Sequence, residues 1–234
     1  MKTESIMLHS DGSEMQTFIA RAESPKSPGL ILFQEAFGVT EHIKDVCERF
    51  AKLGYTVAAP ELFHRTAPPG FTVSSTDWNA AAPHFQAVNA DTIASDATAV
   101  FEWLKNDSHV DSSRIGAIGF CLGGRCAFIS NGKLPLRAAV SFYGGGINTL
   151  LDLVPTQSAP ILFFWGGLDT HITPELLHAT MDAMTKASKP FINVEISDAN
   201  HAFFNDQRPA YGAVAAKHAW ALTTSFLGTH LKGA

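Results

Sequence analysis

Short and almost wholly apolar runs alternate along this chain with segments whose apolar residues recur every three or four positions. The clearest runs are GLILF at 29–33, IGAIGF at 115–120 and ILFFW at 161–165. Runs of this kind are typical of strands buried on both faces, and helices between them cover a parallel sheet. The pattern predicts an α/β protein with a mostly parallel central sheet flanked by helices. We expect one domain over residues 1–234, because no repeat or low-complexity linker divides the chain.

Local signals place the individual elements. Residues 5–10 and 15–22 are expected to form a small N-terminal hairpin about Asp11-Gly12, a favoured two-residue turn. Further strands are expected at 29–37, 55–62, 114–120, 137–144, 159–167 and 190–197. Helices are expected at 40–54, within 83–106, from 122 onward, at 173–187 and at 210–231, with a loop at 63–79.

The composition argues against several classes of function. The net charge is −5 with no basic stripe, so we expect no nucleic-acid partner. The first residues lack the apolar core of a signal peptide, and no apolar run is long enough to span a membrane. The three cysteines do not suggest a disulfide framework, so a cytoplasmic location is expected. We also expect a monomer or a small homo-oligomer. Phosphate-cradling glycine motifs, H-E-x-x-H and C-x-x-C are absent, so we expect neither cofactor nor metal.

A glycine-flanked cysteine follows the strand expected at 114–120. The stretch GFCLGG at 119–124 has the form G-x-C-x-G and leads into a predicted helix. In α/β-hydrolases the nucleophile lies on such a strand-to-helix turn, where small neighbours let strand and helix approach. A thiol at a helix N-terminus is also favoured as the thiolate. Cys121 is therefore the candidate nucleophile, the alternative being a buried structural cysteine.

An acid and a histidine follow two later strands. Asp169 comes directly after the strand expected at 159–167, and His201 follows the strand expected at 190–197. The order nucleophile, acid, histidine is that of α/β-hydrolase triads, and the carboxyl ends of parallel strands meet at one crevice. Each residue taken alone could be an ordinary loop residue. Together they predict a triad of Cys121, His201 and Asp169.

Four segments in the same order resemble the dienelactone hydrolases, or carboxymethylenebutenolidases: FQEAFGV at 33–39, GFCLGG at 119–124, GGLD at 166–169 and NHAFF at 200–204. The resemblance implies an α/β-hydrolase that cleaves a small ester or lactone through a thioester on Cys121. It also implies that Glu35 takes the thiol proton when substrate displaces its carboxylate. The backbone N–H groups of Ala36 and Leu122 are expected to form the oxyanion hole.

The sequence departs from the family where the substrate is held. The family binds the carboxylate of dienelactone with two arginines, but residues 66–104 contain no Lys or Arg. The second arginine position is Asn205, and the family's serine beside the histidine is Ala202. Arg65 or Arg208 could substitute from nearby loops. Because a buried carboxylate without a partner is costly, we expect a neutral or more apolar ester or lactone to be accepted at least as well.

Aromatic side chains and one further histidine are the expected lining of the substrate pocket: Phe37, Phe71, Trp78, Tyr143, His171, Phe203 and Phe204. Two alternative functions remain open at this point. One is acyl or thioester transfer in the same site, and the other is a non-catalytic or redox-sensing protein that retains the fold. A complete triad favours hydrolysis over the second alternative.

Overall fold

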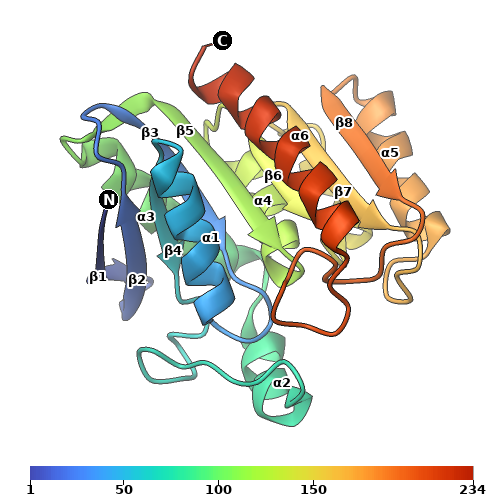
Figure 1. Ribbon diagram of the computed structural model, residues 1–234, viewed down its shortest axis with the longest axis horizontal. Helices are drawn as coiled ribbons and strands as arrows, with labels where there is room; N and C mark the ends of the chain where they lie inside the picture. The colour runs from blue at the N-terminus through green and yellow to red at the C-terminus, as the bar shows by residue number, and fades with distance from the viewer. Residues whose placement is uncertain (234) are drawn as a thin grey trace.

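The computed structural model describes residues 1–233 as an eight-stranded sheet with helices on both faces (Figure 1). The strands are β1 (Lys2–Ser10), β2 (Ser13–Arg21), β3 (Ser27–Phe33), β4 (Thr56–Pro60), β5 (Val110–Phe120), β6 (Ala139–Phe142), β7 (Ile161–Gly166) and β8 (Phe191–Ile196). The helices are α1 (Glu41–Lys52), α2 (Trp78–Ala87), α3 (Ala90–Asn106), α4 (Leu122–Lys133), α5 (Pro174–Lys186) and α6 (Ala213–Leu231), with 3-10 helices η1 (Ile147–Thr149) and η2 (Leu151–Leu153). Helices α1 and α6 cover one face, and α3, α4 and α5 the other.

The sheet has the order β1-β2-β4-β3-β5-β6-β7-β8. From β4 to β8 all neighbouring strands are parallel, whereas β2 joins β4, and β1 joins β2, in antiparallel pairs. The hairpin turn uses Asp11 at φ 48° and Gly12 at φ 75°, the left-handed pair that matches the twist of two antiparallel strands. The predicted parallel sheet with an N-terminal hairpin is therefore confirmed.

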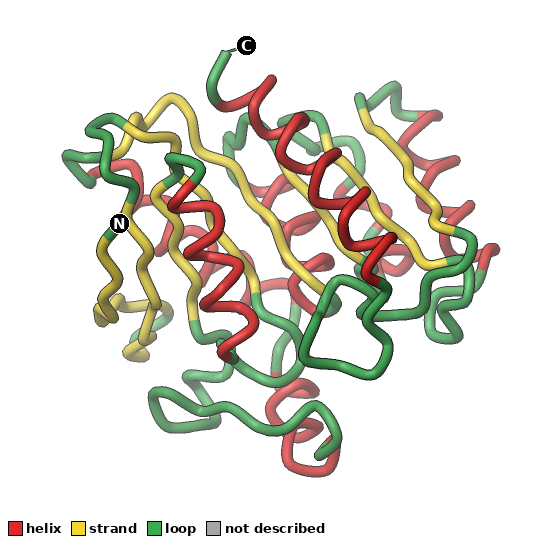
Figure 2. The backbone as a smooth tube through the Cα atoms, in the orientation of Figure 1, coloured by secondary structure: helices red, strands yellow, loops and turns green. Residues whose placement is uncertain are grey.

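Two predicted boundaries were wrong, and both corrections shape the carboxyl edge of the sheet. Strand β3 ends at Phe33, so residues 34–37 belong to a loop rather than to the strand. The long helix expected within 83–106 is two helices, because Asn89 begins a new one. The Asn89 side chain accepts backbone N–H groups of Asp91 and Thr92 in a capping box. Helix α2 and the long loops before it and after β8 gather beyond this edge (Figure 2).

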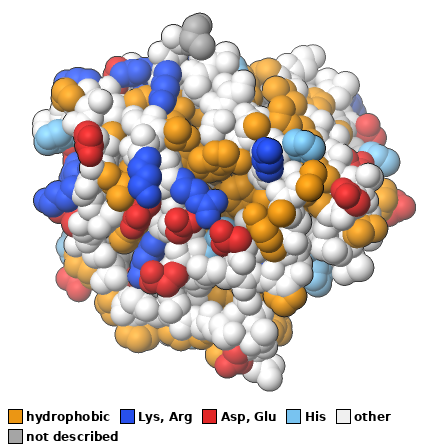
Figure 3. Space-filling model, viewed as in Figure 1, with side chains coloured by type: hydrophobic (Ala, Val, Ile, Leu, Met, Phe, Trp, Pro, Cys, Tyr) orange, Lys and Arg blue, Asp and Glu red, His pale blue; other side chains and the backbone are white. Residues whose placement is uncertain are grey.

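Aromatic rings fill the core beneath the carboxyl ends of the central strands. Phe142 packs between Phe120 and Phe164, with ring centroids 4.7 and 4.5 Å apart, and all three side chains are buried. Large buried rings contribute strongly to the hydrophobic stabilisation of a core. On the face shown in Figure 3, acidic and basic side chains intermingle. Within α1, Arg49 forms an ion pair with Asp45. Within residues 1–233, no helix has the length and apolar character needed to cross a membrane.

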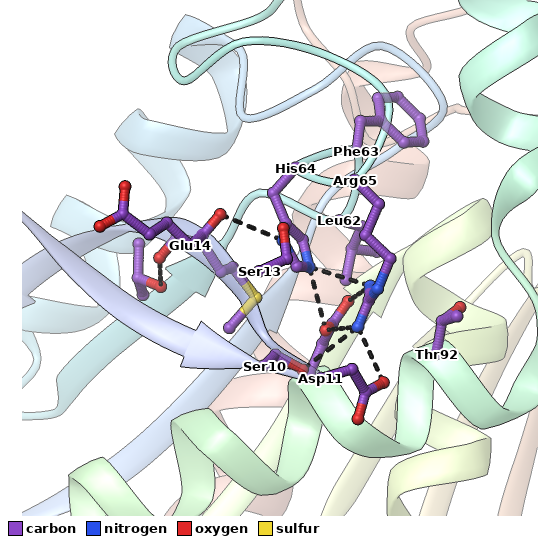
Figure 4. Close-up of polar contacts among 12 residues, drawn as sticks. Ser10, Asp11, Ser13, Glu14, Leu62, Phe63, His64, Arg65 and Thr92 are labelled. Atoms are coloured by element: carbon purple, nitrogen blue, oxygen red, sulfur yellow. Dashed lines mark hydrogen bonds and ion pairs between the residues drawn. The ribbon is translucent and has the colours of Figure 1, made fainter.

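A buried ionic cluster ties the hairpin to α3 (Figure 4). Arg65 donates to both carboxylate oxygens of Asp96, at 2.8 and 3.0 Å, and His64 Nε2 lies 3.1 Å from Asp96 Oδ1. Arg65 also donates to Ser10 Oγ at 3.2 Å and to Asp11 Oδ2 at 3.1 Å. Burial opposes the charge on Asp96, but the hydrogen bonds from His64 and Arg65 prevail and lower its pKa. The Arg65 guanidinium is thus occupied within the fold.

Asp96→Ala should destabilise the protein because it leaves the Arg65 guanidinium half-buried without its main partner. Breaking a buried pair in this way typically costs about 3 kcal/mol of unfolding free energy. Glu102→Ala is the matched control, since Glu102 is exposed on the same helix and pairs only with Lys105. It should cost less than about 0.5 kcal/mol. Equal losses for the two variants in urea unfolding would show that the cluster contributes little.

Candidate active site

The turn from β5 into α4 holds Cys121 in a conformation that L residues rarely adopt. Cys121 has φ 56° and ψ −114°, and its N–H donates to Phe142 O at 3.0 Å. Strand and helix nearly touch here. A Cβ added at Gly119 would lie 2.0 Å from Gly123 O, and one at Gly123 would lie 2.3 Å from Phe33 O. Backbone strain of this kind is retained where the surroundings enforce it, commonly at functional sites.

His201 and Asp169 are brought together from the ends of β8 and β7. The Nδ1–H of His201 donates to Asp169 Oδ2 at 2.6 Å. The other carboxylate oxygen accepts the backbone N–H groups of His171 at 2.8 Å and Ile172 at 3.2 Å. Asp169 is buried, and these bonds fix both its oxygens. The hydrogen bond at Nδ1 therefore fixes the orientation of the imidazole.

Electrostatics in this group favour the charged pair. Burial opposes a charge on His201, but the hydrogen bond with Asp169 and the nearby Cys121 thiol outweigh it and raise the pKa of His201. Burial also opposes ionisation of Asp169, yet the hydrogen bond from His201 and two backbone N–H groups lower the pKa of Asp169.

Cys121 and His201 line a cavity of about 590 Å³, a size typical of small-molecule sites. Of the predicted pocket residues, Phe37, Trp78 and His171 line this cavity. The remaining four, Phe71, Tyr143, Phe203 and Phe204, are not among its lining residues.

These four aromatic side chains pack against neighbouring rings instead. Tyr143 is fully buried with its ring centroid 5.0 Å from that of His201, and Phe203 packs on Tyr143. Phe204 stacks on Phe120 at 5.3 Å, while Phe71 lies against His84 at 4.4 Å. The sequence pattern shows that these residues are aromatic and near the site. It cannot distinguish side chains that line the cavity from those that pack behind it, because both are apolar.

Glu35 lines a second cavity of about 380 Å³ beside the first, and Phe37 and Arg208 border both. The Glu35 side chain is buried, and its Oε2 accepts a hydrogen bond from Asn205 Nδ2 at 2.6 Å. Its Oε1 is buried without a partner in the described chain. No hydrogen bond joins Glu35 to Cys121 within residues 1–233. The carboxylate is therefore tethered by Asn205, with one oxygen unengaged.

Two backbone donors border the nucleophile. Ala36 and Leu122 both line the cavity that holds Cys121, and Leu122 is the first residue of α4. In the part of the chain described, neither N–H donates to a backbone carbonyl in a turn or loop. Unpaired N–H groups beside a nucleophile are suited to hold a developing oxyanion. Across residues 1–233, no cluster of three or more His, Cys, Asp or Glu side chains is placed to hold a metal ion.

Sequence reasoning missed one cation in the cavity. Arg125 lines the cavity with Cys121, and Arg208 does so from the loop after β8. Arg65, the other substitute considered, is held in the ionic cluster with Asp96. The signal for Arg125 was its position four residues after Cys121, because residues at i and i+4 adjoin on one helix face.

Comparisons with known proteins place this chain in a family. The sequence model of the "Dienelactone hydrolase family" matches residues 15–231. A protein of Methylorubrum extorquens named "Putative carboxymethylenebutenolidase" is 34% identical over 85% of this chain and 71% of its own. The "Carboxymethylenebutenolidase" of Pseudomonas putida is 28% identical over 92% of both chains.

A crystal structure from Klebsiella pneumoniae, named "Putative Dienelactone Hydrolase", superimposes with a TM-score of 0.85 at 29% identity. The superposition covers 97% of this chain and 98% of that one. The chain belongs to the dienelactone hydrolase family, with the α/β-hydrolase fold. It is accordingly a hydrolase, as the resemblance predicted.

Asp169→Asn should lower the pKa of His201, because the neutral amide no longer stabilises the imidazolium. The titration midpoint of His201, followed by NMR of the imidazole ring, should therefore move to lower pH than in the wild type. Asp198→Asn is the control, as Asp198 is an exposed residue of the loop that leads to His201. An unshifted midpoint in Asp169→Asn would mean that the carboxylate does not govern the charge of the histidine.

Proposed function

We propose that this protein hydrolyses a small carboxylic ester or lactone through an acyl-thioester on Cys121. The observation that carries the proposal is the strained Cys121 at the strand-to-helix turn, sharing a cavity with a His201 already bonded to Asp169. The names of the relatives, carboxymethylenebutenolidases, agree with a lactone or ester as substrate. Cys121, His201 and Asp169 are the proposed triad.

In the first half-reaction, the Cys121 thiolate attacks the carbonyl carbon of the substrate. The carbonyl π electrons move to oxygen, and the N–H groups of Ala36 and Leu122 hold the resulting oxyanion. When the oxyanion collapses, the bond to the leaving oxygen breaks, and His201 Nε2 gives that oxygen a proton. The acyl group is then a thioester of Cys121, and in a lactone the new hydroxyl stays attached to it.

In the second half-reaction, neutral His201 takes a proton from water while the water oxygen attacks the thioester carbon. The same two N–H groups hold the second oxyanion. Its collapse expels the Cys121 thiolate and releases the carboxylic acid, with the proton left on His201. Asp169 stabilises the imidazolium in both halves and is not itself protonated.

Glu35 is the proposed proton acceptor that controls the thiol. Its unengaged Oε1 is buried at the border of the cavity system, while Asn205 holds Oε2 at 2.6 Å. A carboxylate near a thiol disfavours the thiolate, which protects the resting cysteine from oxidation. When substrate displaces the carboxylate, proton transfer from Cys121 to Glu35 creates the nucleophile, and after product release Glu35 returns this proton to the Cys121 thiolate.

The redox-sensing alternative lacks a suitable second thiol. Cys126 is fully buried on α4, and burial raises its pKa far above that of an ordinary thiol. A resolving cysteine has to be accessible and able to ionise. Cys126 is neither, so hydrolysis is the function we propose for this site.

Cys121→Ala should lower kcat/KM for ester hydrolysis by at least about 10³-fold, because no other group can form the acyl intermediate. Cys126→Ala and Cys47→Ala are matched controls, since both remove a buried thiol away from the turn, and they should stay within a few-fold of wild type. Mass spectrometry of rapidly quenched wild-type enzyme should show the acyl group on Cys121. Full activity of Cys121→Ala would refute the assignment of the nucleophile.

Glu35→Gln should speed iodoacetamide labelling of Cys121 in the resting enzyme, because it removes a negative charge that opposes the thiolate. The same change should lower turnover, as no carboxylate remains to accept the thiol proton. Glu41→Gln is the control, because Glu41 lines the same cavity as Glu35 but has an exposed side chain. Wild-type labelling and turnover in Glu35→Gln would leave Glu35 with a structural role alone.

A further inference from the structure

The cavity that holds Cys121 carries positive charge without any acidic side chain. Its lining includes Arg125, Arg208, His171 and His201, and no Asp or Glu of the described chain is among the lining residues. The neighbouring cavity differs, because Glu35 and Glu41 line it. The two cavities therefore suit different chemistry, and the one with the nucleophile favours a negatively charged ligand.

Arg125 lines this cavity without an acidic partner. Its Nε is buried without a hydrogen-bond partner, and within residues 1–233 it forms no ion pair. The half-buried Arg65 and Arg114 do pair, with Asp96 and Asp111, whereas Arg208 forms no ion pair in the described chain either. Withdrawing a charge from water without a partner is costly, so an unpaired guanidinium at a cavity wall needs a reason.

The surroundings of Arg125 hold its planar head group in place. Its guanidinium carbon lies 5.6 Å from the ring centroid of Phe85 on α2. On another side, its NH1 would come within 3.2 Å of a Cβ at Gly146, in the loop after β6. A guanidinium fixed in this way keeps its donors preorganised, and its fork matches the two oxygens of a carboxylate.

Arg208 is less suited to the same task. Its guanidinium lies over the Phe37 ring at 5.3 Å, on the β3 side of the site, where it borders both cavities. Glu35, a buried acid with one unengaged oxygen, lines one of those cavities with it. Arg208 therefore shares a cavity with an acid, although no ion pair joins the two within residues 1–233, whereas the lining of the cavity around Cys121 and Arg125 includes no acid.

We propose that Arg125 is the residue that binds a carboxylate of the substrate in this protein. The inference rests on the proposed hydrolysis at Cys121 and names a residue that determines the specificity of that site. It places the anchor on α4, one helical turn after the nucleophile, rather than at residue 205 or within residues 66–104. It also replaces the expectation that a neutral substrate is accepted at least as well, which followed from the absence of arginine at those two positions.

The test compares each charged probe with its uncharged methyl ester. Mono-(4-nitrophenyl) glutarate carries a carboxylate on the acyl side, and 4-acetoxybenzoate carries one on the leaving-group side. The readout is the ratio of kcat/KM for the charged probe to that for its ester. Arg125→Gln should lower this ratio by about 10- to 100-fold in at least one pair, as expected for a lost charge-assisted bond. Arg125→Lys should give an intermediate ratio, because it keeps the charge but loses the fork.

Two further arginines serve as comparisons. Arg137→Gln removes an exposed arginine remote from the cavity lining and should leave the ratio unchanged. An Arg125→Gln ratio equal to that of wild type in both pairs overturns the proposal, as does a loss confined to Arg208→Gln. Failure of the underlying function would look different. In that case Cys121→Ala would still hydrolyse the uncharged methyl esters at the wild-type rate.

Discussion

The close approach of β5, α4 and the end of β3 is the constraint on which the rest of the site depends. A side chain at Gly119 would collide with the first turn of α4, and one at Gly123 would collide with Phe33 O. The same contact that strains Cys121 brings the loop after β3 against the start of α4. Ala36 and Leu122 lie far apart in the sequence, but they therefore line the same cavity as Cys121.

Parallel strands supply the remaining parts of the site at the same edge. Asp169 follows β7 and His201 follows β8, and their hydrogen bond joins the two loops. The raised pKa of His201 and the lowered pKa of Asp169 have one physical origin, since each group stabilises the charged form of the other despite burial. The aromatic layer beneath, with Phe120, Phe142 and Phe204 in contact, gives these loops a rigid floor.

Charge is divided between two neighbouring cavities. Glu35, held by Asn205, belongs to one, whereas Arg125 belongs to the other together with the nucleophile. Phe37 and Arg208 stand at the border between them. This arrangement separates the acid proposed to control the thiol from the cation proposed to receive the substrate. An anionic substrate near Cys121 would thus be attracted by the positive charge of the cavity. It would also compete with the Glu35 carboxylate for that positive charge.

The sequence by itself determined the parallel sheet, the hairpin, the cysteine turn and the order of the residues proposed as the triad. Those features depend on local patterns, such as apolar runs, glycine spacing and the positions just after strands. Only the tertiary structure decided which charges are free. Asn205 reaches Glu35 and Asp96 occupies Arg65 across long sequence separations, while Arg125 meets no acid. Whether a charge has a partner depends on its neighbours in three dimensions. Tertiary packing likewise decides which aromatic side chains line the cavity and which pack behind it.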